Sequence, residues 1–187
     1  MSRGLGDVYK RQDVARIEAL YQYGGFYMDT DVEVLKSFNP LLEAQCILGM
    51  EEKEYVATSF MAFEKGHPLV KEFLNLYEHL SFLDEKGKII AGTNVAKLTK
   101  MLKEKGFVQE NHYQKLENGI QIYPKEFFSP YDYINCHYNI TENSYCVHHF
   151  AVSWMSKKEQ VKKGIKKRIV KILGPEKMNG IREKLKR

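Results

Sequence analysis

Residues 13–31, DVARIEALYQYGGFYMDTD, contain the pattern from which the rest of the chain is best understood. The apolar residues of its first half recur at the spacing of one helix face: Val14, Ile17, Leu20 and Tyr21. Asp13 suits the N-cap of a helix and Gly24-Gly25 suits its end. We therefore expect a helix over 13–23.

A short buried strand, Phe26-Tyr27-Met28, is expected after the glycines, and it places Asp29-Thr30-Asp31 at its end. Further extended segments are expected at 32–35, 46–50, 56–63, 120–123 and 144–148, and helices at 69–80 and 95–105. The fold class is therefore α/β. An irregular stretch contains Tyr131, Tyr133 and Tyr138, whose rings either meet sugar rings or pack in the core.

The composition is that of one folded domain. The chain has 187 residues, of which 43% are hydrophobic and 12% aromatic, so it is long and apolar enough to bury one core. Neither a run of about 18 apolar residues nor a secretory signal is visible in the sequence. The three cysteines, Cys46, Cys136 and Cys146, lack the C-x-x-C spacing of a zinc ribbon. These features predict a cytoplasmic protein that is soluble or peripheral to a membrane.

The basic charge is concentrated at one end of the chain. The net charge is +5, but residues 157–187 contain 13 Lys and Arg against 3 Glu, so the preceding residues are acidic overall. No nucleic-acid partner is therefore expected. Apolar residues recur at helical spacing among the lysines: Val161, Ile165, Ile169 and Ile172. This tail either docks on an anionic membrane surface or packs as a solvated helix on its own domain.

The chemistry is expected at the acidic loop. Asp29 and Asp31 are two residues apart, so on an extended backbone their carboxylates point to the same side and can share a cation. Oxygen ligands favour magnesium, manganese or calcium over zinc. Asp13 and Arg16 share a helix face, where they form either a surface ion pair or a pair that binds sugar hydroxyls and a diphosphate. A glycoside hydrolase is disfavoured because its paired carboxylates stand on separate elements.

The residues from Asp13 to Asp31 resemble the D-x-D sugar-binding region of glycosyltransferase family 32. The resemblance continues at 35–42, LKSFNPLL, at 63–68, FEKGHP, and at 148–154, HHFAVSW. It implies a GT-A fold, a Rossmann-like α/β sandwich, with Mn²⁺ or Mg²⁺ at the D-x-D loop. It also implies transfer of a hexose from a nucleotide-diphosphate sugar to a glycan or lipid-linked acceptor, with retention, in surface polysaccharide synthesis at the inner face of a bacterial membrane.

The resemblance also implies roles for single residues. Asp29 and Asp31 contact the metal and the ribose or sugar, and His148 or His149 completes the metal sphere. The remaining donor contacts are Asp13, Arg16, Gly25, Tyr27, Ser153 and Trp154. On the residues alone, adjacent histidines on a late strand are more often structural than ligands, and a lone tryptophan more often belongs to the core.

The beginning of the chain departs from the family pattern. Members of the family carry several tens of residues before the Asp-x-x-Arg helix, whereas residues 1–12 match nothing in the family and predict an unstructured or foreign leader. The expected domains are this leader, a glycosyltransferase core at 13–156 that is truncated at its N-terminus, and the basic tail at 157–187. The alternative function is a non-catalytic pseudoenzyme that binds a nucleotide sugar or a glycan.

Overall fold

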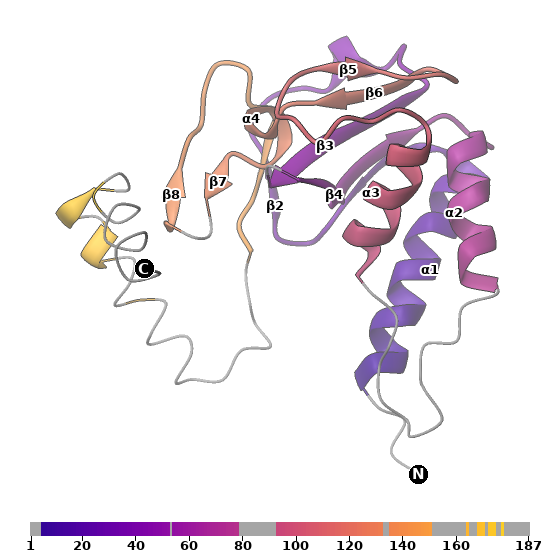
Figure 1. Ribbon diagram of the computed structural model, residues 1–187, viewed down its shortest axis with the longest axis horizontal. Coiled ribbons are helices and arrows are strands. Elements are labelled where there is room, and N and C mark those ends of the chain that lie inside the picture. The colour runs from indigo at the N-terminus through magenta and orange to yellow at the C-terminus, as the bar shows by residue number, and fades with distance from the viewer. Residues whose placement is uncertain are drawn as a thin grey trace.

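A mixed five-stranded sheet lies at the centre of the protein, in the order β1-β4-β3-β6-β5 (Figure 1). The computed structural model describes residues 5–52, 54–78, 93–132 and 135–150, with the short pieces 164, 168–170, 172–174 and 177. The strands of this sheet are β1 Gly25–Met28, β3 Cys46–Glu52, β4 Tyr55–Phe63, β5 Gln114–Lys115 and β6 Ile120–Tyr123. Strands β3 and β6 are parallel, and the other neighbours are antiparallel.

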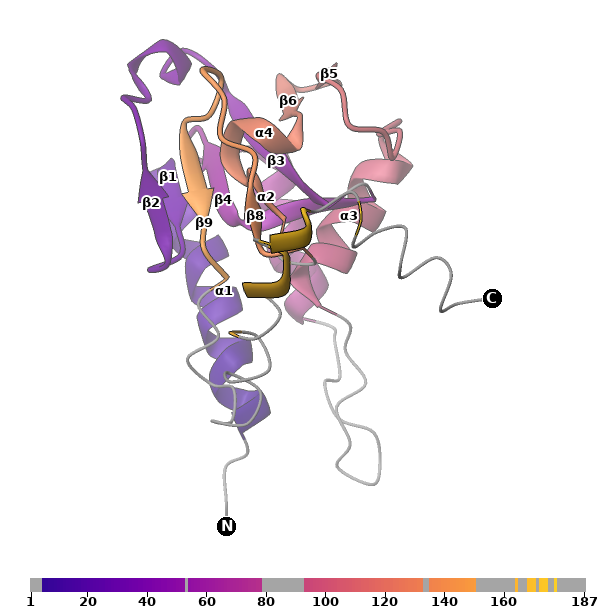
Figure 2. The ribbon, with the colours of Figure 1, turned by 90° about the vertical axis from the view of Figure 1, so that its left-hand side faces the viewer.

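Two shorter strand pairs lie outside this sheet. They are β2 Val32–Val34 with β9 Cys146–His148, and β7 Tyr131–Asp132 with β8 His137–Tyr138. In the first pair Val32 lies opposite His148. Figure 2 shows β2 and β9 side by side. The residues that follow the acidic loop are thereby joined to a strand from the far end of the core.

Three helices cover one face of the central sheet (Figure 1). They are α1 Leu5–Tyr23, α2 Pro68–Glu78 and α3 Asn94–Glu104. Their buried apolar residues share one core with alternate residues of β3, β4 and β6, among them Ile17, Leu20, Leu48, Met61, Phe73, Leu98 and Ile122. In the described part of the chain, no helix is both long and apolar enough to cross a bilayer.

The opposite face of the sheet is covered by a second core. Its elements are α4 Lys125–Phe128, the 3-10 helix η1 Asn39–Leu41 and β9. The rings of Phe60 and Phe128 stack there, with centroids 4.1 Å apart. Gly49 permits this packing, because a Cβ atom at this position would lie 2.7 Å from Cδ2 of Phe128. Since both faces are covered, every residue of β4 after Tyr55 is buried.

The predicted α/β class is confirmed, and the expected strands and the helices α2 and α3 are found close to their predicted bounds. The start of the first helix was predicted wrongly. Helix α1 begins at Leu5, so residues 5–12 are helical rather than unstructured, and Asp13 lies inside the helix rather than at its N-cap. The physical reason is that no proline or glycine interrupts residues 7–23, so a residue that suits a cap does not end a helix that propagates past it.

Candidate functional site

The acidic loop is a tight turn rather than an extended segment. The backbone N–H of Asp29 donates to the carbonyl of Ser59 at 2.9 Å, and the N–H of Val32 donates back to the carbonyl of Asp29 at 3.0 Å. The prediction that the backbone between Asp29 and Asp31 is extended is therefore wrong. The turn still brings side chains together, because Asp29, Asp31 and His148 each offer one ligand atom and these atoms lie within 4.8 Å of one another.

Arg16 and Tyr27 hold the carboxylate of Asp29. Arg16 donates from Nη1 to Oδ1 of Asp29 at 3.0 Å, and the Tyr27 hydroxyl donates to the same oxygen at 2.6 Å. The guanidinium lies 4.9 Å from the centre of the Tyr27 ring and also donates to the carbonyl of Thr58 at 3.3 Å. Burial, together with the hydrogen bond to Asp29, raises the pKa of Tyr27, so its hydroxyl remains a donor at neutral pH.

Asp13 connects this carboxylate cluster to helices α2 and α3. Its Oδ1 lies 3.4 Å from Nη2 of Arg16, which bears out the shared helix face. Burial raises the pKa of Asp13, against the opposing effects of Arg16 and of a hydrogen bond with Asn94. Asn94 also accepts from the hydroxyl of Tyr77. Asn94 and Tyr77 were missed from the sequence, because nothing in the local pattern marks a helix residue that faces another helix.

His148 lies between two acidic residues. Its Nε2 is 3.3 Å from Oδ2 of Asp31, and its Nδ1 is 3.3 Å from Oε1 of Glu51. Burial lowers the pKa of His148, but Glu51 and Asp31 outweigh it and the net shift is upward. The ring of Phe150 packs against the imidazole with centroids 4.0 Å apart. Glu51 is a further residue that the sequence did not single out.

His149 is directed to different partners. Its Nε2 lies 2.8 Å from Oε2 of Glu33, and its Nδ1 lies 2.9 Å from the hydroxyl of Tyr138. Of the two candidate histidines, the structure thus brings His148 to the aspartates. Gly25, another predicted donor contact, is exposed and has a φ of +94°. The predicted contacts Ser153 and Trp154 lie outside the described residues.

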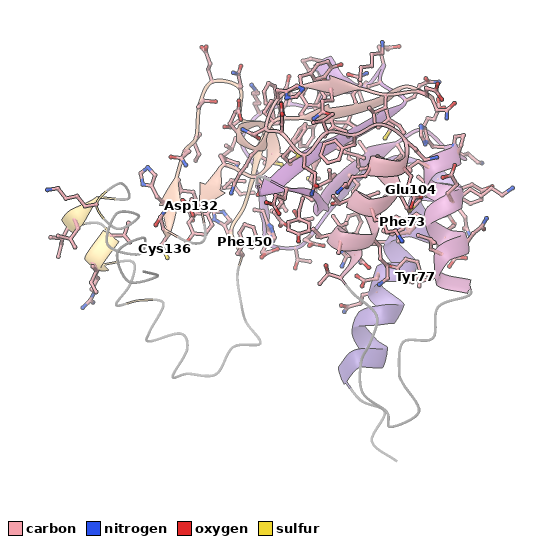
Figure 3. The ribbon with its side chains drawn as sticks, viewed as in Figure 1. Phe73, Tyr77, Glu104, Asp132, Cys136 and Phe150 are labelled. Carbon is pink, nitrogen blue, oxygen red and sulfur yellow. The ribbon has the colours of Figure 1, made fainter. Side chains whose placement is uncertain are left out.

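Two of the three predicted aromatic residues differ in burial, and Tyr133 lies outside the described residues. Tyr131 is buried and packs with Cys136, Val147 and Phe150, and Figure 3 shows Cys136 and Phe150 on the β7–β8 side of the protein. Tyr138 packs against Tyr131 with the ring centroids 4.6 Å apart and the rings tilted by 39°, but it is 37% exposed. Core packing is therefore the role of Tyr131, whereas Tyr138 presents an aromatic ring to solvent.

The segment that carries Arg16, Tyr27 and the two aspartates matches a known family by sequence. Residues 6–48 match the model of the glycosyltransferase sugar-binding region containing the DXD motif. Residues 6–48 are thus similar to a DXD glycosyltransferase region. The resemblance to glycosyltransferase family 32 is thereby confirmed, and the mixed α/β fold is consistent with a GT-A-like domain. The match begins inside the segment that was expected to be foreign to the family.

Individual relatives of this sugar-binding region are also glycosyltransferases by name. Mouse lactosylceramide 4-alpha-galactosyltransferase is 32% identical over 123 residues, which are 66% of this chain and 32% of the mouse protein. Inositol phosphoceramide mannosyltransferase 3 of Schizosaccharomyces pombe is 32% identical over 73 residues, 39% of this chain and 20% of the yeast protein. The chain thus spans about a third or less of these relatives. No solved structure matches it.

The donor set of the sugar-binding region fits a divalent cation. DXD glycosyltransferase domains generally use such an ion, and Asp29, Asp31 and His148 offer two carboxylates and one imidazole to hold it. Both contacts to Asp29 within the described chain fall on Oδ1, which leaves Oδ2 as the oxygen for a cation. The arrangement therefore combines a cation site with a fixed guanidinium at its edge.

Proposed function

We propose that the chain transfers a hexose from a nucleotide-diphosphate sugar to a glycan or lipid-linked acceptor, with the help of a divalent cation. The observation that supports this most is the convergence of Asp29, Asp31 and His148 from two segments far apart in the sequence. Strand pairing explains it, because Val32 lies opposite His148 in the β2–β9 pair. The three side chains are thus held together by a strand pair of the fold, whereas acidic residues that meet by chance on a surface need no such pairing.

The proposed roles follow from the contacts of each residue. Asp29, Asp31 and His148 hold the cation, which when bound neutralises charge on the departing nucleoside diphosphate. Arg16 is held in place by Asp29 and by the carbonyl of Thr58, so its guanidinium is a donor oriented before the substrate binds. Asp13 accepts hydrogen bonds from donor-sugar hydroxyls, and Tyr27, which donates to Asp29 at 2.6 Å, forms a wall of the nucleotide pocket.

The acceptor and the stereochemistry are proposed on other grounds. The mouse and yeast relatives are named for a lactosylceramide and an inositol phosphoceramide, which favours a sugar or polyol carried on a lipid. Family resemblance favours retention of anomeric configuration, with manganese or magnesium as the cation. We further propose that the transfer serves surface polysaccharide synthesis, in which case the acceptor is a glycan.

Donor turnover tests the proposed function. Radiolabelled nucleotide sugars are screened for hydrolysis that manganese stimulates, with this chain and with a longer chain that restores the length of its relatives. We expect one donor to be hydrolysed in a manganese-dependent way. Donor binding without hydrolysis in both chains would support the non-catalytic pseudoenzyme instead, and absence of both binding and hydrolysis would refute the proposal.

The affinity for manganese should depend on pH through His148. The pKa of His148 is raised by Glu51 and Asp31, with a smaller contribution from Asp29, so protonation competes with the cation at neutral pH and below. In the metal-free protein, protonated His148 stabilises the folded state at pH values below the pKa that this histidine has in the unfolded chain. This stabilisation is lost as the pH rises through the higher pKa that His148 has in the folded protein. We expect manganese to bind more weakly, and to raise the unfolding temperature less, at a pH of about 6 than at a pH of about 8.

Calorimetry at both pH values measures this effect. His148→Gln should weaken binding at both and flatten the pH dependence, whereas the exposed His112 is a matched control, and His112→Gln should behave as the parent does. A manganese affinity that is the same at both pH values would contradict His148 as a ligand.

We also propose that the basic tail 157–187 docks on an anionic membrane, such as the inner face of a bacterial membrane. Most of the tail lies outside the described residues, but Ile169 and Ile172 within it are 41% and 82% exposed. Each basic residue near such a surface contributes about 1 kcal/mol. The chain should therefore float with phosphatidylserine liposomes but not with phosphatidylcholine liposomes, and Ile169→Asn with Ile172→Asn should reduce flotation. Equal flotation with both lipids would count against this proposal.

A further inference from the structure

Glu51 is an acidic residue that the family resemblance and the proposed mechanism leave without a role. It lies near the end of β3, and its side chain is only 14% exposed. A carboxylate in this environment loses much of its hydration, so it requires a hydrogen-bonding or charged partner. The partner in the structure is the imidazole of His148, whose own side chain is 11% exposed.

The two nitrogens of His148 face different acidic residues. Nε2 lies 3.3 Å from Asp31, a member of the proposed cation site, whereas Nδ1 lies 3.3 Å from Glu51. Nδ1 is buried from solvent and has no hydrogen bond of good geometry, so Oε1 of Glu51, 3.3 Å away, is the charged atom placed to accept its proton. Glu51 does not belong to the group of ligand atoms that lie within 4.8 Å of one another. The imidazole therefore stands between Glu51 and the cation site.

We infer that Glu51 is a positioning residue that orients His148 toward a divalent cation, an inference that rests on the proposed cation site. Glu51 accepts the Nδ1 proton, which makes Nε2 the nitrogen with the free lone pair. Histidine ligands of metals are commonly held in this way by a carboxylate on their second nitrogen. Glu51 itself contacts no cation.

The position of Glu51 in the fold explains how it does this. His148 belongs to β9, which pairs with β2 outside the central sheet, whereas Glu51 belongs to β3 of the central sheet. The contact between them thus joins the two sheets at the cation site. Phe150 packs against the imidazole from another direction, with centroids 4.0 Å apart. Glu51 and Phe150 together restrict both the tautomer and the tilt of the ring.

Manganese binding, measured by electron paramagnetic resonance, tests the inference without relying on activity. We expect Glu51→Ala to weaken manganese affinity about 10- to 100-fold, the usual range for such a residue. Glu51→Gln, which keeps an oxygen acceptor and the side-chain shape, should lose less. Glu54 is an exposed neighbour in the turn before β4, and Glu54→Gln should bind manganese as the parent does. Unchanged affinity in both Glu51 variants would overturn the inference.

The tautomer of His148 provides a second measurement, by nitrogen NMR of the magnesium-loaded protein, because without a cation Asp31 lies as close to Nε2 as Glu51 lies to Nδ1. The parent and Glu51→Gln should carry the neutral-ring proton on Nδ1, and Glu51→Ala should lose this preference while its unfolding temperature stays near that of the parent. An unchanged tautomer in Glu51→Ala would overturn the positioning role even if affinity fell. Failure of the parent to bind manganese would instead refute the proposed cation site, so the two failures are distinguishable.

Discussion

Asp31→Ala is expected to lower the rate of manganese-dependent transfer by about a hundredfold or more, while the fold remains intact. Removal of one fixed charge that stabilises a transition state typically costs this much. Asp31 lies in a turn beside Asp29 and contacts His148 at 3.3 Å, so its loss leaves two of three proposed ligands. The expected loss of manganese affinity is also larger than that for the Glu51 variants, because Asp31 is a proposed ligand of the cation and Glu51 is not.

Asp31→Asn sharpens this test, since it keeps the side-chain volume and removes only the charge. Manganese affinity and donor turnover should both fall in each variant. The fold should stay intact because Asp31 lies in neither core that covers the sheet, and the lost contact with His148 should lower the unfolding temperature most at low pH. Glu43→Gln is a control for the loss of one exposed negative charge. Turnover equal to that of the parent in either Asp31 variant would refute the assignment of the cation site.

Gly24→Ala is expected to destabilise the protein by about 3 kcal/mol or more. Gly24 has a φ of +68°, a left-handed conformation in which an L side chain is strained. A Cβ atom there would also lie 2.6 Å from the backbone nitrogen of Lys65 and 3.0 Å from the carbonyl of Phe63. Because backbone atoms are the obstacle, no side chain can move to relieve the clash, and strain and overpacking add together.

The adjacent Gly25 offers a matched control. Its φ is +94°, but a Cβ atom there would have no neighbour within 4 Å. Gly25→Ala should therefore lower the free energy of unfolding only by the backbone strain of a positive φ, about 1 kcal/mol, which is the low end of the usual cost of such strain. Urea unfolding of the two variants measures the difference. Equal destabilisation by the two substitutions would show that close backbone packing at Gly24 does not matter.

The consequence for the site follows from where the turn lies. Gly24 connects α1, which carries Arg16, to β1, which carries Tyr27 and leads to Asp29. Arg16 and Tyr27 meet on the carboxylate of Asp29, so a displaced turn alters the site as well as the fold. Weakened manganese binding should accompany the loss of stability in Gly24→Ala.

Local patterns in the sequence were sufficient for much of the fold. The apolar spacing of α1, the glycines at its end and the apolar run of β4 each depend on neighbours a few residues away, and each led to an element that the structure contains. The start of α1 at Leu5 was not predicted, because a residue with a good capping side chain also fits inside a helix. The turn at Asp29 was missed because the spacing of two aspartates does not specify backbone dihedral angles.

The candidate site divides in the same way. The residues at 13–31 determine a helix, a turn and a strand that present Arg16, Tyr27 and an acidic pair together, since all of these depend on spacing along one short segment. The choice of His148 over His149, and the presence of Glu51 and Asn94, depended on how distant strands and helices pack. Strand register and helix docking depend on how much apolar surface the whole core buries, and a short stretch of sequence does not determine that quantity.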